Sequence, residues 1–554
     1  MVGEANLDPI TVRILWDRLG SIVNQATMAH KRTAFSTLVR EANDFAATLL
    51  SPDARILVNA ESALPPFVAA PGFALQHLLT LFPRDSLQAG DVLITNDPWI
   101  AAGQAMDIVL LQPIVRGDRV VAFAGSMAHA PDLGGAQRWN RSFDVFEEAL
   151  RIPNMKLFDA GVRNETLIEM IRHNSRLPEL AIGDLEAQLA ALHVLNASVL
   201  DMMEEYELAD LDELIDEIFS RSERAMRNAI ARIPDGEYQA QLESDGYPDP
   251  ARPQSPAEPF VIRVRVTVAD SDLTVDFSDS SEQRPGPFNG VWSICEAYAA
   301  YALRTTLVPY LPNNDGFNRP LTVVCPEGTV VNARFPAPTL SRHVVASQVC
   351  DPIFRALADV IPEQVISPSG NGPPWGLLLM GESADGAPYH RLIIISGGSG
   401  ATAEKDGETY LFPGNVSNTP VETMESLMPL LWECKEIIPD SGGPGRHRGG
   451  VGQRMTARAL RPLSYSMING RVEHPPLGLL GGLPGRAGRF AAAGQDLPPG
   501  CDGFLAPGDL LVVETPGGGG LGAPSERDPA SVSEDVAEGF VTAEVASATY
   551  GAAR

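Results

Sequence analysis

Apolar residues recur at helical spacing near the start of the chain. Five of them form one face of a 3.6-residue repeat: Ile14, Leu15, Leu19, Ile22 and Val23. Asp8 is a suitable N-cap and Pro9 suits the first helical position, so the pattern predicts a helix over residues 9–35. The same periodicity predicts further helices over residues 71–82, 185–205, 209–232, 290–306 and 347–360.

Other segments are typical of strands, either as short apolar runs or, at 261–268 and 273–277, as residues that alternate with a period of two. Two such runs, at 108–115 and 119–125, flank the turn Arg116-Gly117-Asp118 and predict a central β-hairpin. Shorter strands are expected at 48–51, 56–58, 92–94, 261–268 and 273–277. From about residue 320 onward, short strands and loops rich in Gly and Pro dominate.

These elements predict a mixed fold, α/β in the broad sense (α+β), with two lobes. We expect a mixed α/β lobe over residues 1–235, carrying the central hairpin and the helices, and a β-rich lobe with glycine-rich loops over residues 236–554. A chain of 554 residues has ample apolar material for several cores, since 44% of it is hydrophobic.

The central hairpin brings two chemically useful side chains together. Asp107 stands at the entrance of its first strand and His129 just past the exit of its second, and these ends are neighbours in an antiparallel pair. A carboxylate beside an imidazole is typical of a metal site or of an acid–base pair. It is also typical of a buried His–carboxylate pair that only stabilises a loop. The hairpin alone leaves all three interpretations open.

Composition excludes some classes of partner and compartment. The formal net charge of −28 and the pI of 4.7 argue against binding to nucleic acid or to an anionic membrane surface. Five widely spaced cysteines form no C-x-x-C pair, which fits a reducing compartment: Cys295, Cys325, Cys350, Cys434 and Cys501. Neither a secretory signal nor an apolar run of 18 residues is present, so a cytoplasmic location is expected.

Two glycine-rich segments could in principle cradle a phosphate. They are Asp440 to Gly450, which contains Arg446 and Arg448, and Gly517 to Gly520. Neither has the G-x-x-x-x-G-K-[ST] order of a nucleotide P-loop. The pattern favours a tight structural or subunit-contact loop, with phosphate contact as the alternative.

Several motifs together resemble the hydantoinase B/oxoprolinase family. They follow the family's order from about Asp8 to Tyr550: Asn96-Asp97-Pro98, Gln104-x-x-Asp107, His129-x-x-Asp132-Leu133-Gly134-Gly135, Asn174-Ser175-Arg176-x-Pro178, Gly183-Asp184-Leu185-x-Ala187-Gln188, Asp440-Ser441-Gly442-Gly443 and Thr515-Pro516-Gly517-Gly518-Gly519-Gly520. The family also includes subunits related to oxoprolinase, caprolactamase and ketone carboxylases.

The resemblance implies a set of site residues. It implies Asp44, Asp107, His129 and Gln104 as ligands of a divalent metal, Zn²⁺ or Mn²⁺. From the hairpin and the loop that follows it, we expect a catalytic set of Asp107, His129 and Asp132, with substrate contacts from Gln104 and Arg138. The alternative for Arg138 is a surface arginine without a substrate contact.

This chain departs from the family pattern at the metal site itself. Relatives carry a histidine at the position of Gln104, Ala130 replaces the second histidine of a pair, and the run from Pro66 to Ala70 lacks another. The alternative to a working metal site is a decayed one, in which Asp44, Asp107 and His129 bond only to each other.

The resemblance implies one half of a two-part enzyme. A partner resembling the A-type chain of hydantoinases would bind ATP and phosphorylate a cyclic amide such as a hydantoin, oxoproline or lactam. This chain, in a hetero-oligomer, would complete the hydrolytic ring opening. The alternatives are a subunit of an ATP-dependent ketone carboxylase, acting on a ketone of the acetone or acetophenone type, and a non-catalytic structural subunit.

Overall fold

The first part of the chain forms a seven-stranded antiparallel sheet with the order β2-β1-β5-β4-β3-β6-β7. The computed structural model describes residues 7–136, 139–252, 255, 257–383, 385–409 and 419–551. The strands of this sheet are β1 (Phe45–Leu50), β2 (Ile56–Asn59), β3 (Val92–Thr95), β4 (Asp107–Arg116), β5 (Arg119–His129), β6 (Met155–Asp159) and β7 (Val162–Arg163).

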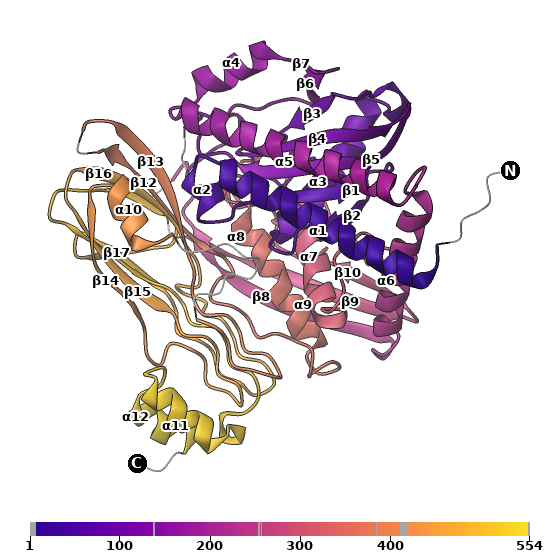
Figure 1. Ribbon diagram of the computed structural model, residues 1–554. Coiled ribbons are helices and arrows are strands. Elements are labelled where there is room, and N and C mark those ends of the chain that lie inside the picture. Colours follow the sequence, from indigo (N-terminus) through magenta and orange to yellow (C-terminus); the bar gives the residue numbers. More distant parts are fainter. Residues whose placement is uncertain are drawn as a thin grey trace.

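Helices cover both faces of this sheet. The long helices α1 (Pro9–Thr33) and α5 (Pro178–Glu205) pack together over one face, as Figure 1 shows, and α3 (Pro65–Leu81) packs on the other. Successive residues of a strand point to opposite faces, so Leu49 joins the core under α1 and Leu50 joins the core under α3. This double coverage explains why β1 is buried along its whole length.

The predicted elements of this region are largely confirmed. The helix expected over residues 9–35 is α1, capped by Asp8, and the predicted central hairpin is β4 and β5. The helix expected over 71–82 is α3, which starts earlier, because Pro65 and Pro66 are suited to the first positions of a helix. Pro71 lies inside this helix. Strands β6 and β7 were not predicted. The remaining short helices of this region are α2 (Thr37–Arg40), η1 (Arg84–Ser86), η2 (Val145–Glu147) and α4 (Glu165–Asn174).

A second sheet, with the order β11-β10-β9-β8, continues the same body. Its strands are β8 (Gly236–Tyr247), β9 (Glu258–Ala269), β10 (Asp272–Asp276) and β11 (Leu321–Val324). The helices beside it are α6 (Asp212–Ile230), α7 (Trp292–Leu307), α8 (His343–Ala346), η3 (Ser347–Val349) and α9 (Cys350–Leu357). Its apolar residues belong to the same hydrophobic core as α1 and α5. The boundary expected between residues 235 and 236 therefore does not coincide with a division of the core.

The last third of the chain forms two more sheets around a separate core. The four-stranded sheet has the order β13-β12-β16-β19 and the five-stranded sheet the order β14-β15-β20-β17-β18. Their strands are β12 (Trp375–Glu382), β13 (Pro388–Ile395), β14 (Leu430–Ile437), β15 (Gln453–Ala459), β16 (Leu463–Ile468), β17 (Arg489–Ala492), β18 (Gln495–Leu497), β19 (Cys501–Leu505) and β20 (Leu510–Glu514). The helices are α10 (Val421–Leu427), η4 (Pro524–Glu526), α11 (Pro529–Ala537) and α12 (Ala543–Tyr550). The mixed α+β fold is thus as predicted.

Beside these sheets lies a glycine bundle, formed by residues 367–372, 396–400, 441–452, 478–485 and 516–520. In Figure 1 these segments run as extended coils from the sheets toward α11 and α12. They hydrogen-bond side by side without forming a sheet; for example, Gly450 donates to the Ser399 carbonyl at 2.8 Å and Gly518 to the Gly450 carbonyl at 2.9 Å. A Cβ on Gly518 would overlap the Ser399 carbonyl, so only glycine permits this backbone contact.

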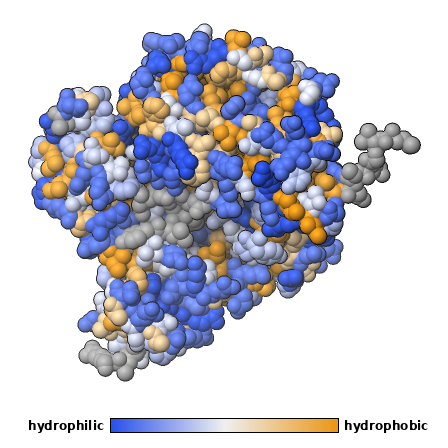
Figure 2. Space-filling view, viewed as in Figure 1, coloured by the Kyte–Doolittle hydropathy of each residue, from blue (hydrophilic) through white to orange (hydrophobic). Residues whose placement is uncertain are grey.

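The face of the molecule in Figure 2 is mostly hydrophilic, and apolar residues form small separate groups on it. None of the helices in the described ranges combines the length and apolar character needed to cross a membrane.

Helix α1 buries an imidazole, and this leads to a prediction about acid stability. His30 is fully buried, packs edge-on against Phe45 at 4.4 Å, and has no hydrogen-bond partner for either ring nitrogen within the described residues. Burial lowers the pKa of His30 from 6.5 to about 3. Between these values the unfolded chain binds a proton that the folded chain does not. His30 therefore costs stability progressively as the pH falls from 6.5 toward 3.

We expect His30→Leu to be nearly neutral at about pH 7.5 and to stabilise the protein by about 2 kcal/mol relative to wild type at about pH 5. Thermal unfolding at both pH values measures the difference. His173, whose side chain is 77% exposed, provides the matched control, and His173→Leu should give no comparable change between the two pH values. An equal effect of His30→Leu at both pH values would contradict the prediction.

Candidate active site

Three neighbouring strand ends bring Asp44, Asp107 and His129 together. Asp44 directly precedes β1, His129 ends β5 and Asp107 begins β4. Asp107 and His129 are direct partners in the β4–β5 ladder, and the backbone N–H of His129 donates to the Asp44 carbonyl at 3.2 Å. The predicted proximity of Asp107 and His129 is therefore confirmed.

The side chains of this group are closely coupled. His129 Nδ1 lies 2.9 Å from Asp107 Oδ1 and 4.0 Å from Asp44 Oδ2. An ionised carboxylate can only accept, so Nδ1–H is the donor to Asp107. Burial raises the pKa of Asp44 to about 6; His129 opposes the rise, the Asp107 carboxylate adds to it and Arg342 opposes it.

Arg342 reaches the same group from a loop more than 200 residues away. Its Nη2 lies 2.6 Å from Asp107 Oδ2, and its Nε donates to the Ala102 carbonyl at 2.7 Å. The side chain is 8% exposed. His343 follows it, and burial together with the charge of Arg342 lowers the pKa of His343 to about 3, so its ring is neutral. The sequence interpretation did not include either residue.

Asp44, His129, Arg342 and His343, but not the fully buried Asp107, line a cavity with about 660 Å³ of space free of protein atoms, part of it open to solvent. Its polar lining consists of Asp44, Gln104, His129, Arg342 and His343, together with the polar groups of Trp139, Tyr298 and Trp375. The rest is apolar: Leu64, Pro66, Phe67, Ile294, Pro374, Gly376, Leu392, Ile394 and Ile468. Residues of β12, β13 and β16 thus form part of the cavity wall, together with residues at the strand ends of the first sheet.

Gln104 and Asp132 have different surroundings. Gln104 lines the cavity, and its Nε2 donates to the Leu340 carbonyl at 2.8 Å. Asp132 is fully buried and holds its own loop: its Oδ1 accepts from the Gly134 N–H at 3.1 Å and from Arg176 Nη1 at 2.9 Å. Asp132 is absent from the cavity lining, so its geometry suits a positioning role for the loop after His129.

Two arginines, Arg138 and Arg141, follow the loop after His129 in the sequence. Arg138 lies outside the described residues. Arg141 pairs with Asp502 at 2.9 Å.

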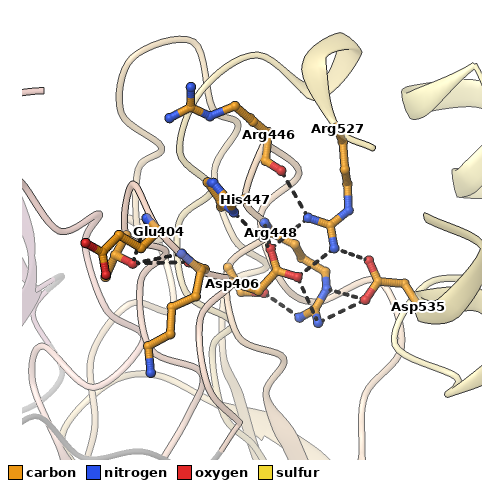
Figure 3. A network of polar contacts seen from close by, with 10 residues as sticks. Glu404, Asp406, Arg446, His447, Arg448, Arg527 and Asp535 are labelled. Carbon is orange, nitrogen blue, oxygen red and sulfur yellow. Dashed lines mark hydrogen bonds and ion pairs between the residues drawn. The ribbon is translucent and has the colours of Figure 1, made fainter. Parts of the chain in front are cut away.

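In the glycine-rich loop, Arg448 lies 3.1 Å from Asp535, and Arg527 lies 2.6 Å from both Asp406 and Asp535, as Figure 3 shows. Nε and Nη2 of Arg448 contact Asp535 and its Nη1 donates to the Gly449 carbonyl, so contacts within the chain engage every nitrogen of its guanidinium. This supports the structural interpretation of that loop over phosphate contact.

The side chains as they lie here do not fit the divalent metal that the resemblance implies. Both oxygens of Asp107 are engaged, one by His129 and one by the guanidinium of Arg342. Among the described residues, no three His, Cys, Asp or Glu side chains are grouped so that they could hold a metal ion. A cation bound at Asp107 would also face the fixed positive charge of Arg342.

Comparisons with known proteins extend over nearly the whole chain. A family model described as hydantoinase B/oxoprolinase matches residues 8–524. A putative D-/L-hydantoinase B-type chain from Pseudomonas sp. (strain NS671) is 31% identical over 570 residues, covering 98% of this chain and 95% of that protein.

Two solved structures share the fold. The ATP-dependent caprolactamase from Pseudomonas jessenii has a TM-score of 0.89 at 24% identity, covering 98% of this chain and 96% of that chain. A nucleotide-free acetone carboxylase has a TM-score of 0.88 at 19% identity, covering 98% of this chain and 79% of that chain. At these identities the two structures establish a common architecture.

Proposed function

Because the chain belongs to the hydantoinase B/oxoprolinase family, we propose that it is the B-type subunit of an ATP-dependent cyclic amidase. In this proposal ATP is bound by a separate A-type subunit, which phosphorylates the amide oxygen of a cyclic substrate. The present chain then completes the hydrolytic ring opening. The two chains form a hetero-oligomer.

The observation that carries the proposal is the cavity in which Asp44, His129 and Arg342 meet a largely apolar wall. Hydrolysis of an activated amide needs a proton acceptor for water, a positive group for the developing negative charge, and a pocket for the ring. Asp44, with its pKa raised to about 6, is the proton acceptor. The guanidinium of Arg342 is the positive group, and the apolar wall holds the hydrocarbon part of the ring.

The reaction begins with the addition of one water molecule to the phosphorylated amide. Water adds to the ring carbon, Asp44 takes up its proton, and the C–N bond breaks. Both protons of the water end on the ring nitrogen, which leaves as a free amine, and the carbon is left as an acyl phosphate. A second water hydrolyses the acyl phosphate to a carboxylate and inorganic phosphate.

The other residues orient these groups. The hydrogen bond between His129 Nδ1 and Asp107 fixes the orientation of the His129 ring beside Asp44. The side-chain oxygen of Gln104 is suited to accept from the ring nitrogen once that nitrogen has taken up a proton, because the amide nitrogen of Gln104 already donates to Leu340. Asp132 positions the loop that follows His129.

The test is the identity of the product. The chain is purified with an A-type partner and given ATP, Mg²⁺ and a panel of hydantoins, oxoproline and lactams. We expect ring-opened amino acids and inorganic phosphate from the complex, without a requirement for bicarbonate, and no turnover from the isolated chain. Strict dependence on bicarbonate would instead indicate a ketone carboxylase. Turnover that survives both Asp107→Ala and His129→Ala would indicate a non-catalytic subunit.

A further inference from the structure

We propose that Arg342 supplies the fixed positive charge of the cavity at the position where the family resemblance implies a divalent cation. On this view the chain binds no metal ion at Asp107 and His129. The absence of a cation site follows from the geometry alone. A second part of the proposal rests on the proposed function: the guanidinium meets a negatively charged substrate oxygen, such as a phosphoryl oxygen.

The first argument is the way in which Arg342 is held. Its Nη2 and Nε make separate contacts, to the carboxylate of Asp107 at 2.6 Å and to the carbonyl of Ala102 at 2.7 Å. The first of these takes the Asp107 oxygen that His129 leaves available. An arginine cannot be deprotonated in a protein, so this position carries a permanent positive charge.

The loop that carries Arg342 is itself anchored. The backbone N–H groups of Thr339 and Leu340 donate to Glu148 Oε1 at 2.7 and 2.8 Å. The hydroxyl of Ser341 donates to the Trp139 carbonyl at 2.7 Å. The guanidinium is therefore fixed before a substrate arrives, and a fixed charge stabilises a developing anion without the cost of reorganisation.

Gln104 is the second argument. Its amide nitrogen donates to the carbonyl of Leu340, two residues before Arg342. A neutral imidazole with a free lone pair is a good metal ligand, whereas this amide serves to hold the arginine loop. The side chain of Gln104 and the guanidinium of Arg342 are thus parts of one arrangement.

A guanidinium and a metal ion offer different chemistry. Both can stabilise negative charge on a substrate oxygen, and the planar donors of arginine match the oxygens of a phosphoryl or carboxylate group. Only the metal would lower the pKa of a bound water. A site built on Arg342 therefore requires a separate proton acceptor, and the Asp44 carboxylate is in the same cavity.

The test is a titration of the protein with Mn²⁺, in which electron paramagnetic resonance measures the concentration of the free ion. Four proteins are compared: wild type, Arg342→Gly, the double variant Gln104→His with Arg342→Gly, and Arg355→Gly as a control at an exposed arginine. We expect no stoichiometric site in wild type or in the control. The double variant should bind one Mn²⁺ per chain, about 100-fold more tightly than wild type, through Asp107, His129 and the new imidazole.

A stoichiometric Mn²⁺ site in wild type that is lost in Asp107→Asn would overturn the proposal. This measurement needs neither a folded double variant nor a substrate. Its result is therefore independent of whether the chain is a cyclic amidase. Arg342→Lys, which keeps the charge, should exclude Mn²⁺ as wild type does, and binding of Mn²⁺ by this variant would contradict the role given to the charge.

Discussion

Replacing Asp44 by asparagine is expected to lower kcat of the reconstituted enzyme about 10²- to 10⁴-fold. The amide has nearly the shape of the carboxylate but cannot accept a proton from water. Asp44 lines the cavity beside His129, and burial keeps its pKa at about 6, near the range in which a base works best at neutral pH. KM should change little, because the substituted group acts on water rather than on the substrate.

Single-turnover measurements distinguish this effect from a loss of partner function. The A-type subunit should still phosphorylate the substrate in the Asp44→Asn complex, so the phosphorylated intermediate should accumulate. Asp85→Asn is the matched control, since the side chain of Asp85 is 95% exposed, and it should leave kcat unchanged. If Asp44→Asn keeps kcat within a few-fold of wild type, Asp44 is not the proton acceptor.

The largest effect on stability is expected from Gly518→Ala, at about 3 kcal/mol or more. Gly518 lies within the glycine bundle, where its N–H donates to Gly450 and its carbonyl accepts from Gly443 at 2.8 Å. An added Cβ would meet the backbone of Ser399 and Gly400, which cannot rotate away as a side chain can. Thermal unfolding of the purified variant, or its loss from the soluble fraction, measures the effect.

Gly20→Ala provides a control with the opposite sign. Gly20 lies inside α1, and no atom lies within 4 Å of an added Cβ. The substitution should therefore stabilise the protein by about 1 kcal/mol, which is the difference in helix propensity between glycine and alanine. If Gly518→Ala unfolds at the same temperature as wild type, the backbone of the glycine bundle can shift to accommodate a Cβ, and the prediction is wrong.

Local patterns predicted the elements that carry the centre of the site. The strand-like segments 108–115 and 119–125 around a glycine turn predicted the β4–β5 hairpin, and this hairpin places Asp107 opposite His129. The proximity of the two side chains follows from antiparallel pairing, without knowledge of the rest of the fold. Asp44 joined the candidate site through family resemblance, and the pairing of β1 with β5 accounts for its position.

The contacts that complete the site could not be predicted in this way, because they are distant in the sequence. Arg342, His343 and Trp375 reach the cavity from segments more than 200 residues beyond His129. No periodicity links an arginine in a loop to a carboxylate on a strand end. The only local signal was the dipeptide Arg342-His343 at the start of an apolar run, which is unusual next to buried residues.

The cavity has one consequence for how such proteins can diversify. The groups assigned to the chemistry stand at the strand ends of the first sheet and on the loop of Arg342, whereas the wall formed by Trp375, Leu392 and Ile468 comes from β12, β13 and β16, in the last third of the chain. Mutations in that wall can reshape the space for the ring while leaving the proton acceptor and the guanidinium in place. Substrate preference and reaction type can therefore evolve separately within one chain.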